Sequence, residues 1–279
     1  MLDPPLFDGG RTRITEMVPM ALELNDEVVD TPPRDAASVL LLRDAANGVG
    51  VEIFMVRRHQ RSDVLGGAYV FPGGKVDEAD SAVVRDAALM ERMYQRLGEP
   101  DLGREMAAAM FAAAARETVE ECHVTVAVAE LVPFTRWITP RTPSLQRKRF
   151  DTRFFAAPLP DGAQATHDNH EAVDSIWFAP RLALERYWAG DIDLAPPQIM
   201  SLAQLARYRS LSDALADFDR RPPPLIEPAS MKIEEARAVA YPGDPAHSRR
   251  DKVMPGPTRL VFRNKRFEPE GGFAAFFEE

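Results

Sequence analysis

Apolar residues in the first half of the chain cluster in short runs of strand length. Two such runs, 37–43 and 51–58, flank a polar segment that contains Asn47-Gly48. Because an Asn-Gly pair favours the tight turns of β-hairpins, these runs predict an antiparallel hairpin. A shorter apolar run at 68–71 predicts another strand inside a glycine-rich loop.

Helical spacing dominates the segments that follow this loop. Residues 81–97 and 103–122 are rich in Ala, Met, Glu and Arg, which are good helix formers, so we expect helices there. Strand patterns then alternate with two more helical stretches. The expected strands are 124–134, 149–159 and 173–180, and the expected helices are 180–189 and 196–219.

The prolines at 222–224 mark a boundary, because consecutive prolines cannot continue a helix. Beyond them the pattern predicts a strand at 238–244 and a second hairpin at 258–268. The whole pattern predicts the α+β class, as an α/β/α sandwich in which a mixed β-sheet lies between helices. We therefore divide the chain into an N-terminal arm (1–35), a main domain (36–220) and a C-terminal extension (221–279).

The composition narrows the class of protein. The chain has 279 residues, of which 45% are hydrophobic and 28% charged, as in a globular protein that buries a core. A net charge of −9 argues against general nucleic-acid binding, which needs a basic surface. A single cysteine, Cys122, fits a reducing compartment. Because the pattern contains neither a signal peptide nor a membrane-spanning run, we expect a cytoplasmic protein with no membrane partner.

The end of the second expected helix, RETVEECHV (116–124), carries the candidate chemistry. At about 100° per residue, Glu117, Glu120 and Glu121 lie within roughly one third of the helix circumference. Their mutual repulsion is relieved if they point into water or share a cation, and oxygen ligands suit Mg²⁺ or Mn²⁺ better than zinc. Arg116 can reach Glu120 at i+4 and orient it. From composition alone, a solvated helix end is the commoner explanation.

A glycine loop upstream, FPGGKVDEAD (71–80), changes this balance, because glycines let the backbone approach a phosphate or a metal ion closely. Loop and helix together resemble the signature of the Nudix hydrolases, G-x5-E-x7-R-E-U-x-E-E-x-G-U, in which U is a bulky apolar residue. The chain departs from this signature at four points. Asp80 stands for the first glutamate, residues 81–115 replace the seven-residue spacer, Thr118 stands for an apolar residue, and His123 stands for the glycine.

The last of these departures concerns the end of the helix. A glycine at this point usually ends a helix in a left-handed conformation, which a histidine adopts only at some cost. We therefore expect the helix to end differently and to run directly into a strand at Val124.

The resemblance implies roles for individual residues. Four residues would hold the expected cofactor, Mg²⁺ or Mn²⁺: Gly73, Glu117, Glu120 and Glu121. Arg116 would join Glu120 and Glu121 in the catalytic set. A general base is expected either on the helix or on a later loop, where Glu171 is the first candidate and Asp174 the second.

The long insertion resembles that of a member of the peroxisomal coenzyme A diphosphatase subgroup of the Nudix hydrolases. This implies a small substrate, a nucleoside diphosphate linked to another moiety, with coenzyme A or acyl-CoA favoured. Phosphates need cationic or backbone contacts. The residues expected to bind the substrate are Arg57, Arg58, Gly73, Gly74, Arg141 and Arg149.

Two other interpretations stay open. The same chemistry can act on ADP-ribose, NADH or a dinucleotide, and a Nudix fold can also serve as an inactive nucleotide sensor. The intact glutamates of the RETVEE run argue against a sensor, whereas Asp80 and His123 leave it open. The pattern does not decide between a monomer and a homodimer.

Overall fold

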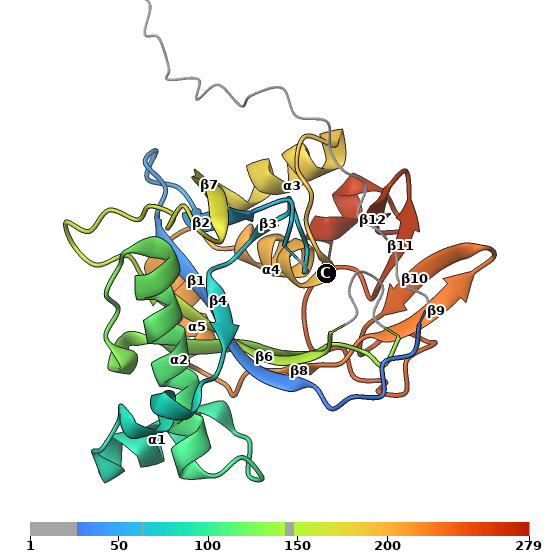
Figure 1. Ribbon diagram of the computed structural model, residues 1–279. Coiled ribbons are helices and arrows are strands. Elements are labelled where there is room, and N and C mark those ends of the chain that lie inside the picture. Colours follow the sequence, from blue (N-terminus) through green and yellow to red (C-terminus); the bar gives the residue numbers. More distant parts are fainter. Residues whose placement is uncertain (1–26, 63, 143–147, 279) are drawn as a thin grey trace, which may run out of the picture.

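The computed structural model describes residues 27–62, 64–142 and 148–278. Most of the predicted N-terminal arm lies outside these described residues. The described chain folds into an eight-stranded sheet, helices on both of its faces, and a second sheet of four strands (Figure 1). This arrangement confirms the predicted α+β class.

The larger sheet has the strand order β3-β2-β1-β6-β5-β8, with β4 paired to β1 and β7 paired to β2. Its strands are β1 (Arg34–Asp44), β2 (Val51–Arg58), β3 (Tyr69–Val70), β4 (Gly73–Lys75), β5 (Val132–Ile138), β6 (Phe150–Pro158), β7 (Ala172–Phe178) and β8 (Leu225–Ile226). The predicted hairpin is present, because β1 and β2 pair antiparallel on either side of Asn47-Gly48. Since β1 also pairs in parallel with β6, the sheet is mixed, as expected.

Alternation along β1 explains why both faces of this sheet are covered. Leu40 and Leu42 belong to the core on one face, whereas Val39 and Leu41 belong to the core on the other. The first face packs against three helices, α3 (Pro180–Ala189), α4 (Pro196–Leu205) and α5 (Leu211–Phe218), and the second face packs against α1 (Ala87–Leu97) and α2 (Arg104–Cys122). The sheet is thus the middle layer of the predicted sandwich.

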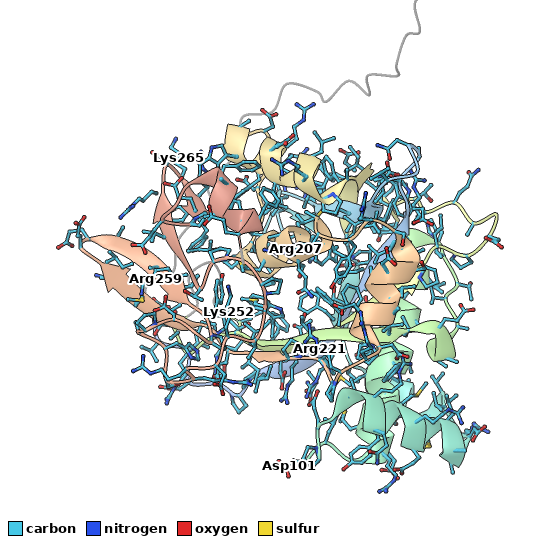
Figure 2. All side chains as sticks on the ribbon, turned by 180° about the vertical axis from the view of Figure 1, so that it is seen from behind. Asp101, Arg207, Arg221, Lys252, Arg259 and Lys265 are labelled. Carbon is cyan, nitrogen blue, oxygen red and sulfur yellow. The ribbon has the colours of Figure 1, made fainter. Side chains whose placement is uncertain are left out.

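The C-terminal extension forms the smaller sheet, in the order β12-β11-β10-β9. Its strands are β9 (Ala229–Ile233), β10 (Ala236–Ala240), β11 (Arg259–Arg263) and β12 (Arg266–Glu268), and short 3-10 turns lie at η1 (Glu78–Ala82), η2 (Val128–Glu130) and η3 (Phe273–Phe277). β11 and β12 form the predicted second hairpin. Asp101 and Lys265 lie far apart in Figure 2, which shows the insertion and the extension at opposite ends of the molecule.

Two predicted elements differ from the structure. The strand expected at 124–134 begins only at Val132, because Val124 and Val126 are buried beneath α2 without joining the sheet. The helix expected at 196–219 is two helices, since Ser210 caps the second one by accepting a hydrogen bond from the Asp213 amide. No helix of the described residues has the length and apolar character needed to cross a membrane.

The predicted insertion, 81–115, folds as α1 and the N-terminal part of α2, and a buried ion cluster ties it to the sheet. Glu99, between the two helices, accepts hydrogen bonds from Arg153 of β6 at 3.1 and 2.6 Å. It also pairs with Arg136 of β5 at 2.8 Å. The Arg153 side chain is only 2% exposed and also contacts Asp35 and Asp151. The insertion is therefore anchored by charge at its far end.

Replacing this carboxylate tests the anchor. We expect Glu99→Gln to lower the free energy of unfolding by about 1–3 kcal/mol, because it weakens the pairing of a buried guanidinium. Urea denaturation followed by circular dichroism measures the change. Asp101→Asn, the same change of chemistry at an exposed position in the same connection, serves as the control and should stay within about 0.5 kcal/mol. Equal losses in the two variants would contradict the anchoring role.

Candidate active site

The carboxylates at the end of α2 differ sharply in exposure. The side chains of Glu117 and Glu120 are 12% and 57% exposed. Glu121 is buried, with 6% of its surface exposed. A solvated helix end therefore does not describe Glu117 and Glu121, which point towards the sheet and the glycine loop.

The glycine loop lies against these carboxylates because it has no side chains in the way. The Gly73 amide donates a hydrogen bond of 2.9 Å to Glu121 Oε2. A Cβ atom on Gly74 would lie 2.4 Å from Glu117 Oε1, and one on Gly73 would lie 2.4 Å from the carbonyl oxygen of Ala37. Since β4 pairs with β1, the sheet holds the loop in this position. Both positions therefore require glycine, because a side chain would collide with these neighbouring atoms.

Arg116 connects the loop, the η1 turn and the helix. Its Nε and Nη2 donate to the two carboxylate oxygens of Asp80, each at 3.0 Å, and Nη2 also donates to the Lys75 carbonyl oxygen at 2.9 Å. Its Nη1 donates to Glu117 at 2.7 Å and to Glu120 at 3.0 Å. The predicted i+4 contact with Glu120 is thus present. Asp80, although shorter than glutamate, reaches Arg116 because the η1 turn carries it to a buried position.

Burial makes the ionised state of the two inner carboxylates unfavourable. Desolvation raises the pKa of Glu121 to about 8, against the hydrogen bond from Gly73, and the negative charge of Glu117 adds to the rise. Desolvation likewise raises the pKa of Glu117, against the hydrogen bond from Arg116. A cation beside both groups would favour their charged forms.

The donor chemistry fits a hard divalent cation such as Mg²⁺ or Mn²⁺, because these carboxylates offer oxygen atoms and neither cysteine nor histidine joins them. Among the described residues, no group of three Asp, Glu, His or Cys side chains has the arrangement of a complete metal site. Arg116 instead lies between Glu117 and Glu120 and engages one oxygen of each. The oxygen atoms of these carboxylates are therefore suitable ligands for such an ion, and Arg116 pairs with Glu117 and Glu120 in the structure.

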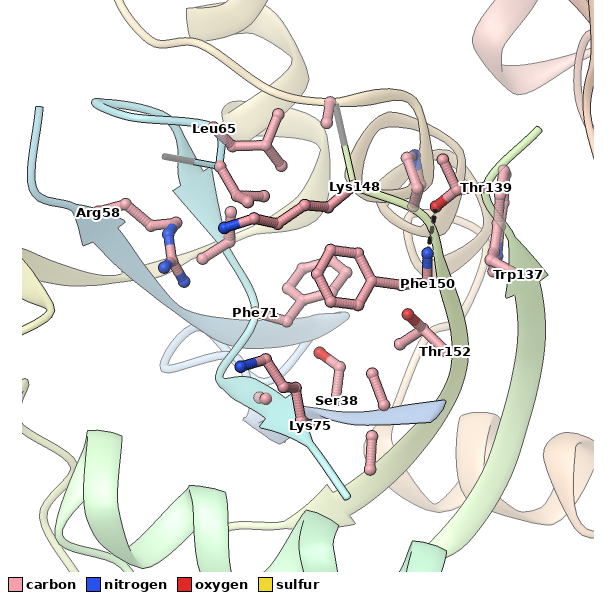
Figure 3. A pocket seen from close by; sticks show the side chains of 18 of the residues that line it. Ser38, Arg58, Leu65, Phe71, Lys75, Trp137, Thr139, Lys148, Phe150 and Thr152 are labelled. Carbon is pink, nitrogen blue, oxygen red and sulfur yellow. Dashed lines mark hydrogen bonds between the residues drawn. The ribbon is translucent and has the colours of Figure 1, made fainter. Parts of the chain in front are cut away.

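A cavity of about 860 Å³ opens beside this cluster. Glu117, Glu120 and Glu171 line it, and Arg58 of β2 and Lys75 of β4 project into it (Figure 3). Glu171 lies immediately before β7, with its Oε2 atom 3.7 Å from Arg58 Nη2. Its negative charge also contributes to the raised pKa values of Glu117 and Glu121. The cavity thus holds acidic and basic groups side by side.

Comparison with known proteins agrees with this geometry. The family model described as the NUDT19 Nudix domain matches residues 116–205, which include Glu117, Glu120, Glu121 and Glu171.

Residues 116–205 thus match a Nudix domain, and the chain is similar to the Nudix hydrolases.

Relatives and solved structures support this assignment. The acyl-coenzyme A diphosphatase NUDT19 of Gallus gallus is 25% identical over 323 residues, which covers 82% of this chain and 85% of that protein. The acyl-coenzyme A diphosphatase NUDT19 of Homo sapiens is 36% identical over 80 residues, which covers 29% of this chain and 21% of that protein. The crystal structure of a Nudix hydrolase from Alicyclobacillus acidocaldarius has a TM-score of 0.56 and 24% identity, and covers 67% of this chain and 97% of that one. The fold is therefore the Nudix fold, including the layered arrangement seen in Figure 1.

The arginines suggested by the sequence as substrate contacts separate in the structure. Arg58 lines the Nudix cavity, whereas three others do not reach it. Arg57 is 8% exposed and donates to the Gly67 carbonyl oxygen at 3.2 Å. Arg149 is also 8% exposed and donates to the Thr139 carbonyl oxygen at 2.9 Å, and Arg141 pairs with Asp30 on the surface. Of the four expected arginines, the structure therefore brings only Arg58 to the cavity, and the other three guanidinium groups have partners elsewhere.

Other cavity residues were missed by the sequence analysis. Lys75 and His170 line the cavity, and Lys75 had a sequence signal, since it directly follows the glycine pair. Arg61 and Lys148, which the sequence offers as further basic partners for phosphates, line the cavity too. Of the two candidate bases, Glu171 is in the cavity and Asp174 is not among the residues that line it. Asp174 accepts a hydrogen bond of 2.7 Å from the Tyr69 hydroxyl.

His123 takes the conformation of the glycine that it replaces in the Nudix signature. Its backbone is left-handed, with φ 58° and ψ 26°. Its amide donates to the Val119 carbonyl oxygen at 3.0 Å, and the Val124 amide donates to that of Thr118 at 3.4 Å. The expectation of a different helix end was therefore wrong. Capping hydrogen bonds offset the cost of the left-handed backbone.

Restoring the glycine should stabilise the protein. We expect His123→Gly to raise the free energy of unfolding by about 0.5–1 kcal/mol, because glycine adopts positive φ without the steric cost that a Cβ atom imposes. His123→Ala, which keeps the Cβ atom, should bring no such gain. Urea denaturation of the three proteins measures the difference, and an equal gain in both variants would show that the imidazole, and not the backbone, is responsible.

Adding one methyl group to the loop should disturb the carboxylates. We expect Gly74→Ala to weaken Mn²⁺ binding by at least about tenfold, since its Cβ atom would meet the Glu117 carboxylate and displace either the loop or the ligand. Mn²⁺ titration followed by electron paramagnetic resonance gives the affinity. Gly162→Ala is the control, because no atom beyond its chain neighbours lies within 4 Å of its Cβ position and it lies outside the cavity. Its φ of 74° predicts a loss of stability and no change in Mn²⁺ affinity. Unchanged Mn²⁺ binding in Gly74→Ala would contradict the proposed contact.

Proposed function

We propose that the protein is a metal-dependent pyrophosphohydrolase that cleaves the diphosphate of coenzyme A or an acyl-CoA. The observation that carries this proposal is the pair of carboxylates that lie against the glycine loop beside a large cavity: Glu121, which is buried, and Glu117, which is half-buried. The relative from Gallus gallus, an acyl-coenzyme A diphosphatase that aligns with 82% of this chain, supports the choice of substrate.

The proposed metal ligands are the carboxylates of Glu117, Glu120 and Glu121 and the carbonyl oxygen of Gly73. When bound there, Mg²⁺ or Mn²⁺ neutralises phosphate oxygens and makes the phosphorus more electrophilic. Arg116 keeps Glu117 and Glu120 oriented through its contacts with both. In this role Arg116 positions the carboxylates and does not contact the reacting atoms.

The remaining residues act directly on the substrate and on water. Arg58 and Lys75 balance the negative charge of the diphosphate from the sides of the cavity. Glu171, whose side chain is 64% exposed, accepts a proton from the attacking water. The water oxygen bonds to one phosphorus, the bond from that phosphorus to the bridging oxygen breaks, and two phosphate monoesters leave. For coenzyme A these are 3′-phosphoadenosine 5′-phosphate and 4′-phosphopantetheine.

A substrate panel separates this proposal from the other interpretations. The full chain is incubated with Mg²⁺ or Mn²⁺ and with coenzyme A, octanoyl-CoA, ADP-ribose, NADH and diadenosine polyphosphates, and the products are resolved by chromatography. Preference for the coenzyme A compounds supports the proposal, preference for another compound reassigns the substrate, and no hydrolysis of any compound favours a nucleotide sensor. The cytoplasmic location and the oligomeric state stay predictions.

Removing one carboxylate charge tests the proposed ligands. We expect Glu120→Gln to lower kcat by at least about 100-fold while the unfolding temperature is kept or raised, because the change removes a ligand and also relieves like-charge repulsion. Glu130→Gln, an exposed glutamate outside the cavity, is the matched control and should keep wild-type rates. Wild-type kcat in Glu120→Gln would remove Glu120 from the site.

A further inference from the structure

The C-terminal extension is fixed beside the cavity. β8 adds to the edge of the larger sheet by pairing in parallel with β5, where Trp137 lies opposite Ile226. The ring of Tyr241, which directly follows β10, packs edge-on against Trp137 with 5.7 Å between the ring centroids. His247 hydrogen-bonds to the Glu227 carbonyl oxygen at 2.9 Å. The contacts of Ile226 and Tyr241 hold the extension in one position relative to β5, which borders the cavity, and the His247 bond joins two segments of the extension to each other.

Two residues of the extension, Pro228 and Val239, belong to the lining of the cavity. They join three residues of β5 and β6 to form what we call the apolar end: Trp137, Ile138, Phe150, Pro228 and Val239. In Figure 3, Trp137 lies across the cavity from Arg58 and Lys75, and the ring of Phe150 lies between them. The cavity therefore has a charged side near the glutamates, towards which the Lys148 side chain extends in Figure 3, and an apolar side that the extension completes.

We propose that the apolar end binds the uncharged arm of the substrate, the amide-linked thiol chain with its acyl group, and that the C-terminal extension is thereby part of the substrate site. This inference rests on the proposed function and specifies how its substrate lies in the cavity. The nucleotide half then lies on the charged side.

Charge and size support this orientation. Every phosphate of a coenzyme A ester belongs to the nucleotide half or to the diphosphate that is cleaved, and the arm beyond carries none. Burying a phosphate against Trp137 and Val239 would be costly without a cationic partner, whereas an alkyl chain gains from leaving water there. Arg58, His59 and Arg61 line the cavity from the end of β2 and the segment after it, and they suit the anionic half. A volume of about 860 Å³ also lies within the range, about 300–1,000 Å³, of cavities that enclose whole small ligands.

A buried amide in the same cavity gives a second, independent observation. Gln198, in the first turn of α4, lines the cavity and is 6% exposed. Its Oε1 atom is buried and has no hydrogen-bond partner within the described part of the chain. Such an oxygen is unfavourable unless a partner arrives, and rotation of the terminal torsion exchanges the positions of its amide oxygen and nitrogen. The arm of a coenzyme A ester carries amide groups, so it can complete the hydrogen bonds of Gln198.

The test compares the two halves of the substrate on a variant that fills the apolar end. Val239→Phe should weaken inhibition by 4′-phosphopantetheine by at least about tenfold and leave inhibition by 3′-phosphoadenosine 5′-phosphate within about twofold, because the larger ring occupies space for the arm alone. Hydrolysis of octanoyl-CoA is the assay in both cases. Ile233→Phe is the control, since it enlarges a half-buried apolar residue of β9 in the same sheet that does not line the cavity. It should leave both inhibition constants unchanged.

A second variant covers the case in which Val239→Phe does not fold, which circular dichroism reveals. Phe150→Ala removes a half-buried ring from the apolar end and should show the same selective loss. Equal weakening of both halves, or no inhibition of the wild type by 4′-phosphopantetheine, overturns the proposed subsite. If the wild type hydrolyses no coenzyme A compound, the proposed function fails and the subsite with it, whereas hydrolysis without selective loss overturns the subsite alone.

Discussion

The guanidinium group of Arg116 is the interaction on which the site depends. It joins three parts of the chain, because it bonds Asp80 of the η1 turn, the carbonyl of Lys75 in the glycine loop, and two glutamates of its own helix. The single positive charge of Arg116 thus binds three carboxylates in a partly buried site. The arrangement is stable enough to fold and still leaves an excess of negative charge, which is the condition for attracting a divalent cation.

The contact between Arg116 and Asp80 also explains how the chain tolerates a long insertion inside its signature. Asp80 and Arg116 lie on either side of the inserted segment, and their ion pair holds its two ends together. Within that segment, α1 packs against α2 on the face of the sheet where α2 lies. Glu99 then joins the far end of the insertion to Arg153. The inserted residues therefore lengthen the signature helix without entering the cavity.

Local patterns in the sequence predicted the hairpin of β1 and β2, the helix α2 and the clustering of its glutamates, since each depends on neighbours close in the chain. Local patterns could not show which arginines border the cavity. Arg57 and Arg58 are consecutive residues at the end of β2, where the register of the pairing with β7 shifts, and the fold alone decides which of them borders the cavity. The same holds for Val124 and Val126, whose alternation reflects burial under a helix and not pairing in a sheet. At His123 the sequence rule failed because two capping hydrogen bonds outweigh a local backbone preference.

The short strand β8 has a consequence for where this protein can be cut. Its two residues cover the outer edge of β5, a strand that contains Phe134 and Trp137. A chain ending at the prolines before β8 would leave the backbone amides and carbonyls of that edge open. Exposed edges of this kind recruit strands from other molecules, so a shortened chain is liable to aggregate. The proline run thus marks a boundary in composition, whereas the larger sheet extends past it.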